Sequence, residues 1–395
     1  MTTSELGEPR AMPSDQAGQD DGRQYGQGYG QAGGQVTGAG RTLPGLPMPR
    51  DPALLFDPSR RPRVARHPEG RFPFPIPNGW FIVAAAADLR PGEVRPLFYF
   101  DRDLVLFRSS DGRPFVLDAY CPHLGAHLAV GGQVEDACLR CPFHGWSFDG
   151  GSGRCVDVPY DEHEYLPQRA AVRSYPTIER NHMVWAWHHL EGEPPFYDVP
   201  EVPEFHDPDW SPIVVKDFQI ATCCQEMAEN NVDRAHFKYV HGTDAIPEEE
   251  FFVDGPYKKA VGAGGDFVRE GFGLGLGVLR LKGWTTFVSS TTPIDTGNVH
   301  VRWIFTSPRS LGEDATENAA EAFCAGVSQD IPIWENKIYR DRPLLRAMEK
   351  DIGEHRRWSR QFYSLPGKPA PEPGSGSRSR SGSGPGAGTT PRRDS

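Results

Sequence analysis

Four metal-binding side chains stand in a spacing that constrains this chain more than any other feature. Cys121 is followed two positions later by His123, and seventeen residues separate that histidine from Cys141, which precedes His144 by three positions. Each pair supplies one thiolate and one imidazole, with a proline next to the cysteine and a glycine close to the histidine. Two loops of this composition can hold metal between them, so the region must fold into a frame that brings both loops together.

The mixed ligand set favours a binuclear iron–sulfur cluster. When both thiolates bind one iron and both imidazoles bind the other, the arrangement is the ligation of a Rieske [2Fe–2S] centre. The same four residues could instead hold a tetrahedral structural zinc ion. Zinc loops usually pair cysteine with cysteine and histidine with histidine, so we expect the cluster. The neighbouring Cys138 and His127 are expected to lie outside the ligand set.

A second motif, in the segment CQEMAENNVDRAHFKYVHG, contains Glu229, Asp233, His236 and His241. Two imidazoles and one carboxylate on one side of a metal leave positions open for O2, as in the facial triad of non-haem Fe(II) enzymes. Five residues of a regular helix turn through about 140°, so the two histidines converge only where the helix ends or bulges. Asp233 is placed to hold the imidazole of His236 rather than to bind metal. The alternative is an amphipathic helix whose histidines face a polar cavity.

The two motifs together resemble the large subunit of Rieske non-haem iron oxygenases. The resemblance rests on CPHLGAHL, CPFHGW, ENNVDRAHFKYVHG and DIPIWENK, and it is greatest to the 3-ketosteroid 9α-hydroxylase and cholesterol 7-desaturase branch. It covers most of residues 72–365. In that branch the third iron ligand is the aspartate of a segment like DIPIWENK, which implies Asp330 as the carboxylate ligand. Glu335 is the poorer candidate, as an ordinary helix acid.

This resemblance implies an O2-dependent oxidoreductase with a [2Fe–2S] cluster and a mononuclear Fe(II). Electrons would come from a ferredoxin or a flavin reductase, and the enzyme would hydroxylate or desaturate a hydrophobic, steroid-like substrate. The resemblance also implies a homotrimer in which His123 or His144 of one subunit meets Asp233 of the next. Because related enzymes modify secondary metabolites or aromatic compounds, such a substrate is the alternative.

Two other classes of protein share parts of this pattern. A Rieske electron-transfer protein could carry a ligand-binding domain without catalytic iron, and a binding module could be stabilised by zinc. Metal content separates the three: an oxygenase holds three irons per chain, the electron carrier holds two, and the binding module holds zinc instead.

Turn and periodicity signals predict an α+β fold, with a small all-β unit followed by a unit that mixes strands and long helices. The resemblance implies that these are an all-β Rieske domain and a helix-grip-like α+β catalytic domain with an antiparallel sheet. The expected divisions are a tail over 1–71, the Rieske domain over 72–190, a proline-rich linker over 191–210, the catalytic domain over 211–365 and a tail over 366–395. Both tails are rich in Gly and Ser or Gln and are predicted to be disordered.

Within these regions we expect particular turns, strands and helices. Asp111-Gly112 and Asp149-Gly150 are hairpin signals of the kind that needs a positive φ. The alternation of glycine with apolar residues in GFGLGLGVLRLKGW suits a sheet that leaves room for a bulky ligand, or else a simple close packing. The catalytic region is predicted to contain a helix over about 224–239, strands within 274–293 and 300–308, and helices within 317–340 and 343–364.

Charge and apolar content exclude several functions. The net charge of −11, from 42 basic and 53 acidic residues, argues against nucleic-acid binding. The longest apolar run, Trp80 to Ala87, has eight residues, whereas a membrane-spanning helix needs about 20. Seven cysteines without a recognisable secretory signal do not indicate a disulfide framework, so we expect a cytoplasmic protein with free thiols.

Overall fold

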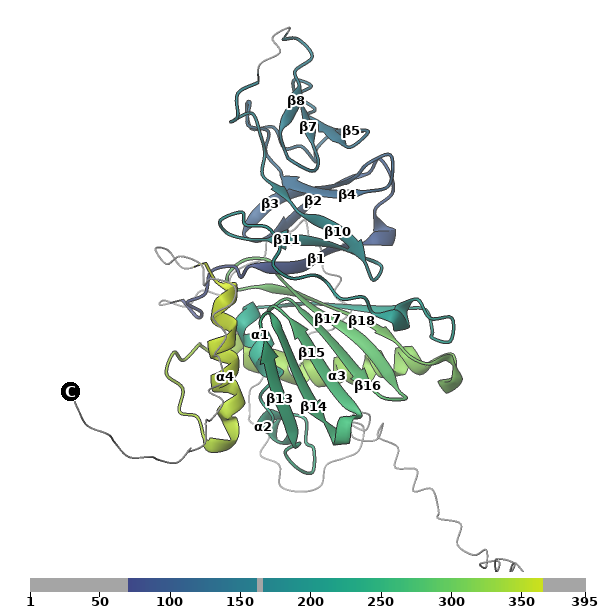
Figure 1. Ribbon diagram of the computed structural model, residues 1–395, viewed down its shortest axis with the longest axis vertical. Coiled ribbons are helices and arrows are strands. Elements are labelled where there is room, and N and C mark those ends of the chain that lie inside the picture. The colour runs from purple at the N-terminus through teal and green to yellow at the C-terminus, as the bar shows by residue number, and fades with distance from the viewer. Residues whose placement is uncertain (1–69, 162–165, 365–395) are drawn as a thin grey trace, which may run out of the picture.

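The structure of the protein, a computed structural model, describes residues 70–161 and 166–364 (Figure 1). It has the α+β architecture expected from the sequence, with an all-β part that carries both Cys–His loops and a second part in which one antiparallel sheet packs against helices. The two tails predicted to be disordered lie outside the described residues, except for residues 70 and 71 of the first tail.

Three small antiparallel sheets build the first part, with strand orders β1-β11-β10, β2-β3-β4-β9 and β5-β6-β7-β8. The strands are β1 (Gly79–Ala85), β2 (Val94–Tyr99), β3 (Arg102–Arg108), β4 (Pro114–Asp118), β5 (Gln133–Glu135), β6 (Cys138–Arg140), β7 (Ser147–Asp149), β8 (Cys155–Asp157), β9 (Ser174–Tyr175), β10 (Thr177–Arg180) and β11 (Met183–His188). In Figure 1 the sheet that contains β5, β7 and β8 lies at the end of the molecule farthest from the helices.

Strand β3 is buried on both faces and joins two cores. Successive side chains of a strand point to opposite faces of its sheet. Leu104 and Leu106 therefore point to the core that also contains Ile220 of the second part. Val105 and Phe107 point to the core that contains both metal-binding cysteines. The run of apolar residues in β3 reflects this double burial, which fixes the cluster loops to the rest of the fold.

The two hairpin signals have different outcomes. Gly112, between β3 and β4, has the expected positive φ of 89°. Gly150, after β7, does not lie in the left-handed region, and Gly153 adopts a φ of 69° in that turn instead. Gly150 is needed for space, because a Cβ atom there would lie 2.5 Å from the ring of Phe115.

A seven-stranded antiparallel sheet in the order β12-β18-β17-β16-β15-β14-β13 forms the second part. Its strands are β12 (Val214–Ile220), β13 (Glu249–Asp254), β14 (Tyr257–Gly262), β15 (Phe267–Phe272), β16 (Leu276–Leu281), β17 (Thr285–Pro293) and β18 (Val299–Thr306). The helices are α1 (Cys224–Asn230), α2 (Ala235–Tyr239), α3 (Ala315–Asn336) and α4 (Lys350–Ser359). Helix α3 contacts β12 and β18 and runs behind the sheet in Figure 1, while α4 packs beside α1.

The helix expected over 224–239 is interrupted between α1 and α2. Oδ1 of Asp233 accepts hydrogen bonds from the backbone N–H groups of Ala235 (3.1 Å) and His236 (3.4 Å), which starts a new helical turn at this point. The long helix α3 and the strands β16 to β18 agree with the prediction, whereas β12 to β15 were not expected.

The proline-rich segment 191–210 contributes to a buried core between the two parts. Val199, Val202 and Phe205 pack in the same apolar cluster as Trp80 of β1 and Val288 of β17. Burial of these side chains stabilises the contact between the parts, because each removes apolar surface from water.

The seven cysteines all lie within the described residues and form no disulfide there. Among the described residues, no helix combines the length and the apolar character that crossing a bilayer requires.

Buried His188 should make the fold sensitive to acid. The side chain lies beside Phe100, with its Nδ1 3.1 Å from the carbonyl oxygen of Pro77. Burial lowers the pKa of His188 from 6.5 to about 3. Between these values the unfolded chain binds a proton that the folded chain does not. The free energy of unfolding should therefore fall as the pH drops from about 6.5 to about 3, by at most about 1.4 kcal/mol per pH unit from this residue.

Urea unfolding of the wild type and of His188→Asn at several pH values measures this contribution. The asparagine amide can still donate to Pro77 but does not titrate, so the variant should show a shallower dependence of unfolding free energy on pH. Equal slopes for the two proteins would contradict the prediction.

Candidate metal centres

The two Cys–His loops are closed by the same pair of backbone hydrogen bonds. In the first loop the N–H of Cys121 donates to the carbonyl of Ala126, and the N–H of Gly125 donates back to the carbonyl of Cys121, both at 2.9 Å. The second loop repeats both bonds at Cys141 and Gly145, at 2.8 and 3.1 Å. Gly125 and Gly145 have φ values of 76° and 73°, which glycine adopts without steric cost.

The structure brings the four predicted cluster ligands together. Cys121 and Cys141 are buried, and burial, with a further contribution from Cys141, raises the pKa of Cys121 to about 11. The imidazole rings of His123 and His144 lie close together, with centroids 4.7 Å apart. Nδ1 of His123 is buried and has no hydrogen-bond partner among the described residues. Two adjacent thiols inside and two adjacent imidazoles outside fit a cluster with sulfur ligands on one iron and nitrogen ligands on the other.

Aromatic and apolar side chains surround these loops. The indole of Trp146 stacks on the ring of His123, with centroids 4.7 Å apart and planes at 4°. Its Nε1 donates to the hydroxyl of Tyr160 at 2.8 Å. Leu124 and Phe143, which follow and precede the histidines, are 65% and 61% exposed. The histidine side of the loops therefore presents an apolar surface to solvent.

The second predicted set also converges. One ligand atom each from His236, His241 and Asp330 lies within 4.8 Å of the others. Helix α2 ends at Tyr239, and the N–H groups of Val240 (2.7 Å) and His241 (3.4 Å) both approach the carbonyl of His236. The departure from regular helix that the spacing required is therefore present, and it turns both histidines towards buried Asp330 of α3.

Hydrogen bonds to the Nδ1 atoms orient both imidazoles. Nδ1 of His241 lies 2.9 Å from Oε1 of Gln329, and its Nε2 lies 3.4 Å from Oδ2 of Asp330. Nδ1 of His236 contacts the backbone carbonyl of Asp233. Since a carbonyl oxygen can only accept, each Nδ1 donates to its partner, which leaves Nε2 as the nitrogen that a metal would bind. No local pattern pointed to Gln329, which lies far along the chain in helix α3.

The acids near the triad have distinct roles in the structure. The backbone carbonyl of Asp233, and not its carboxylate as expected, contacts the imidazole of His236. Glu229 is bound by Arg356 through two hydrogen bonds of 2.6 and 2.8 Å. Glu335 approaches the backbone N–H of Ala221 at 3.4 Å. Asp330 is the carboxylate that faces both histidines.

The electrostatics of the triad suit a cation. Burial lowers the pKa of His236, which favours the neutral imidazole that metals bind. Burial also acts to lower the pKa of His241, but hydrogen bonds to Asp330 and Gln329 outweigh it and raise that pKa overall. The three side chains together favour a cation at this site. One carboxylate and two imidazoles are the donor set of the facial triad.

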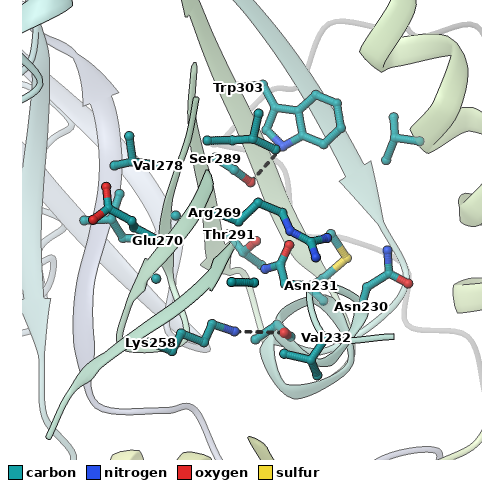
Figure 2. Close-up of a pocket in the computed structure, with 18 of the residues that line it drawn as sticks. Asn230, Asn231, Val232, Lys258, Arg269, Glu270, Val278, Ser289, Thr291 and Trp303 are labelled. Carbon is teal, nitrogen blue, oxygen red and sulfur yellow. Dashed lines mark hydrogen bonds between the residues drawn. The ribbon is translucent and has the colours of Figure 1, made fainter. Parts of the chain in front are cut away.

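The triad opens into a cavity between the sheet and the helices. The cavity contains about 1220 Å³ of space not filled by atoms, part of it continuous with solvent, and its walls include Phe251, Phe287, Trp303 and Trp334. Figure 2 shows polar side chains on the same walls, among them Lys258 of β14. A mostly apolar cavity with a few polar groups is typical of a small-molecule site.

The glycines of the segment 271–277 line this cavity but serve different purposes. A Cβ at Gly275 would lie 2.4 Å from the ring of Phe81, so this glycine permits close packing between the two parts. A Cβ at Gly277 would meet nothing closer than 3.4 Å, so this position leaves space in the cavity wall. Both interpretations of the glycine alternation therefore apply, at different positions.

Comparison with family models assigns both parts. Residues 79–176 match the Rieske [2Fe-2S] domain, and residues 186–363 match the 3-Ketosteroid 9alpha-hydroxylase C-terminal domain. Among solved structures, NdmA of Pseudomonas putida CBB5 has a TM-score of 0.60 at 20% identity, with 71% of this chain and 89% of that chain covered. That likeness supports the fold.

Curated relatives are similar along both parts. Cholesterol 7-desaturase of Caenorhabditis elegans is 31% identical over 338 residues, with 75% of this chain and 78% of the relative covered. The oxygenase component of 3-ketosteroid-9-alpha-monooxygenase from Mycolicibacterium smegmatis is 31% identical over 326 residues, with 74% and 84% covered.

These findings define an O2-dependent oxidoreductase of the Rieske non-haem iron class, which carries a [2Fe–2S] cluster and a mononuclear iron. Within that class, the chain belongs to the family of the cholesterol 7-desaturases and the 3-ketosteroid-9-alpha-monooxygenase oxygenase component. The expected family, fold class, enzyme class and cofactors are confirmed. The two alternatives, a zinc-stabilised binding module and a simple electron carrier, are not needed to explain the chain.

Loss of the Gln329 side-chain amide should weaken iron binding at the triad. Without its Oε1, the ring of His241 loses the acceptor that orients Nδ1, and loss of such a partner typically lowers metal affinity by about 10- to 100-fold. Gln329→Leu should therefore release iron to a chelator faster than the wild type, while the acid-labile sulfide stays unchanged. Gln219→Leu, at an exposed position of β12, is the control. Identical release from Gln329→Leu and Gln219→Leu would show that Gln329 does not position the ligand.

Proposed function

We propose that this enzyme hydroxylates or desaturates a steroid or sterol. The observation that carries the proposal is the opening of His236, His241 and Asp330 into a mostly apolar cavity. The relatives named above act on cholesterol and on 3-ketosteroids. The match to the 3-Ketosteroid 9alpha-hydroxylase C-terminal domain, residues 186–363, includes the strands and helices that form the cavity. A rigid polycyclic substrate suits walls made of aromatic rings and glycine.

We also propose the residues that hold the two groups. Both sets have the donor chemistry that their groups require, as the buried thiols, the orphaned Nδ1 of His123 and the tautomers of the triad histidines indicate. The cluster ligands are Cys121, His123, Cys141 and His144, and the mononuclear iron ligands are His236, His241 and Asp330.

When bound, the cluster supplies single electrons and the mononuclear iron supplies activation of O2. The residues of the chain have separate tasks around that chemistry. Gln329 and the backbone of Asp233 hold the Nδ1 protons, so that the triad keeps its geometry. The aromatic walls exclude water and place the substrate beside the triad.

The arrangement of the two centres supports electron delivery between chains. In Figure 1 the sheet with β5, β7 and β8, next to the cluster loops, and helix α2 lie at opposite ends of the molecule. We propose a homotrimer in which His123 or His144 of one subunit meets Asp233 of the next. The exposed Leu124 and Phe143 support a protein contact at these loops, because apolar and aromatic residues are enriched at the centres of interfaces. A ferredoxin or flavin reductase is the proposed electron donor, and seven cysteines without a disulfide among the described residues support a cytoplasmic location.

Metal analysis of anaerobically purified protein tests the proposed ligands. The wild type should contain three irons and two acid-labile sulfides per chain. Asp330→Ala should lose one iron and keep both sulfides, whereas Cys141→Ser should lose both sulfides and the visible absorption of the cluster. Retention of the third iron by Asp330→Ala would contradict the assignment of that ligand.

Product analysis tests the proposed substrate class. With O2, a ferredoxin and its reductase, the holoenzyme should convert cholesterol or androst-4-ene-3,17-dione to a product that has gained one oxygen atom or lost two hydrogen atoms, as mass spectrometry reports. Labelled O2 separates hydroxylation from desaturation. If protein with a full complement of iron converts neither compound, the substrate is of another class.

Replacement of Asp233 by asparagine should stop electron delivery without removing metal. Asparagine keeps the side-chain oxygen that accepts the N–H groups of Ala235 and His236, so α2 and the triad should persist. Removal of the carboxylate should reduce steady-state turnover by about tenfold or more. Iron content and the reduction of the cluster by dithionite should match the wild type. Normal turnover by Asp233→Asn would rule out the proposed route.

A further inference from the structure

Lys258 is a buried cation in the cavity wall that the proposed chemistry does not use. It lies on β14 at a position that faces the cavity, and only 5% of its surface is exposed. Burial of a lysine ammonium is unfavourable unless the charge is paired or fully hydrogen-bonded. A lysine at this position therefore requires an explanation.

The contacts of Lys258 satisfy the ammonium only in part. Its Nζ donates one hydrogen bond of 2.9 Å, to the carbonyl of Ala228 in α1, and lies 5.2 Å from the ring centroid of Trp358 in α4. An ammonium has three N–H donors. Within residues 70–161 and 166–364, no ion pair includes Lys258.

The carboxylates Glu229 and Glu249 near Lys258 are already paired with arginines. Glu229 of α1 is bound by Arg356 of α4 through two hydrogen bonds, and Arg269 of β15 is paired with Glu249 of β13. Burial lowers the pKa of Lys258 to about 7, and the charge of Arg269 adds to this effect. The surroundings therefore leave the ammonium short of acceptor oxygens.

The neighbouring strand is shaped around the lysine. Lys258 pairs with Gly271 of β15, and a Cβ at that glycine would lie 2.5 Å from Cε of the lysine. The absence of a side chain at this position lets the lysine stem lie along the sheet and carry Nζ towards the cavity. Figure 2 shows Lys258 and Arg269 reaching from the sheet towards the helical turn that carries Asn230 and Asn231.

We propose that Lys258 determines substrate specificity by donating hydrogen bonds to an acceptor oxygen on an otherwise apolar substrate. The oxygen belongs to a ketone or to a carboxylate, and it binds where α1 meets β14, while the apolar skeleton extends along the aromatic walls. This inference rests on the proposed function, since it concerns the same cavity. A purely structural lysine would instead hold α1 to β14 and would affect all ligands equally.

Binding measurements on the holoenzyme test the role of Lys258. The probes are androst-4-ene-3,17-dione as the ketone, 5β-cholanic acid as the carboxylate and 5α-androstane as a hydrocarbon without oxygen. Lys258→Met keeps the length of the side chain but removes all donors. It should weaken binding of the ketone or the acid by about tenfold or more, because hydrogen bonds to charged groups contribute that much, and it should leave the hydrocarbon unchanged.

Control variants separate recognition from structure. Lys259→Met removes a lysine from the next position of β14, which does not line the cavity, and should change none of the affinities. Lys258→Arg keeps a cation and should retain the preference for oxygenated ligands. Lys258→Gln keeps a neutral donor, so it should preserve ketone binding but lose carboxylate binding. If Lys258→Met does not fold, Gly271→Ala provides the test, because its Cβ displaces the lysine stem. This variant should lose the preference for oxygenated ligands over the hydrocarbon.

The outcomes distinguish this inference from the proposed function. If Lys258→Met binds all three probes as the wild type does, or weakens them all equally, the specificity role is wrong while the proposed substrate class stands. If the wild type binds none of the probes, the steroid class is wrong and this inference falls with it. Iron content, measured on the same samples, reports the metal centres independently of either result.

Discussion

Burial of strand β3 on both faces is the constraint on which the relation between the two halves of this enzyme depends. Leu104 and Leu106 pack towards the catalytic part, and Val105 and Phe107 pack beneath the cluster loops. A shift of the strand by one residue would exchange these two sets, so the register is strongly specified. The proline-rich segment adds a second apolar contact between the parts through its buried valines and Phe205. The cluster loops are thus held at a defined position relative to the cavity.

The two metal centres are built by different physical means. Each cluster loop is closed by its own backbone hydrogen bonds, so its ligands are positioned by neighbours in the sequence. The triad depends on the end of α2, on the interrupted helix before it and on α3, which brings Asp330 and Gln329 from a distant part of the chain. Closed local loops suit a cluster that exchanges electrons, whereas separate elements around an open metal leave space for O2 and a substrate.

The parts of the site that depend on local spacing could be predicted from the sequence, and the parts that depend on tertiary contacts could not. The spacing of His236 and His241 predicted that the helix must end or bulge between them, and it does. The role of Asp330 as a ligand could be predicted only from the resemblance to a family. Gln329 was missed because its partner lies on another element. Strand β14 was missed because the buried position at Lys258 is charged, which hides the alternation of apolar and polar residues.

The matching hydrogen bonds of the two cluster loops have a consequence for electron transfer. Because Gly125 and Gly145 close the loops from within, the ligand positions do not depend on a mobile flap or on a disulfide between the loops. Gain or loss of an electron should therefore displace few nuclei. A cluster bound by such loops would keep its ligands in place in both oxidation states, because the backbone that carries them is fixed within each loop.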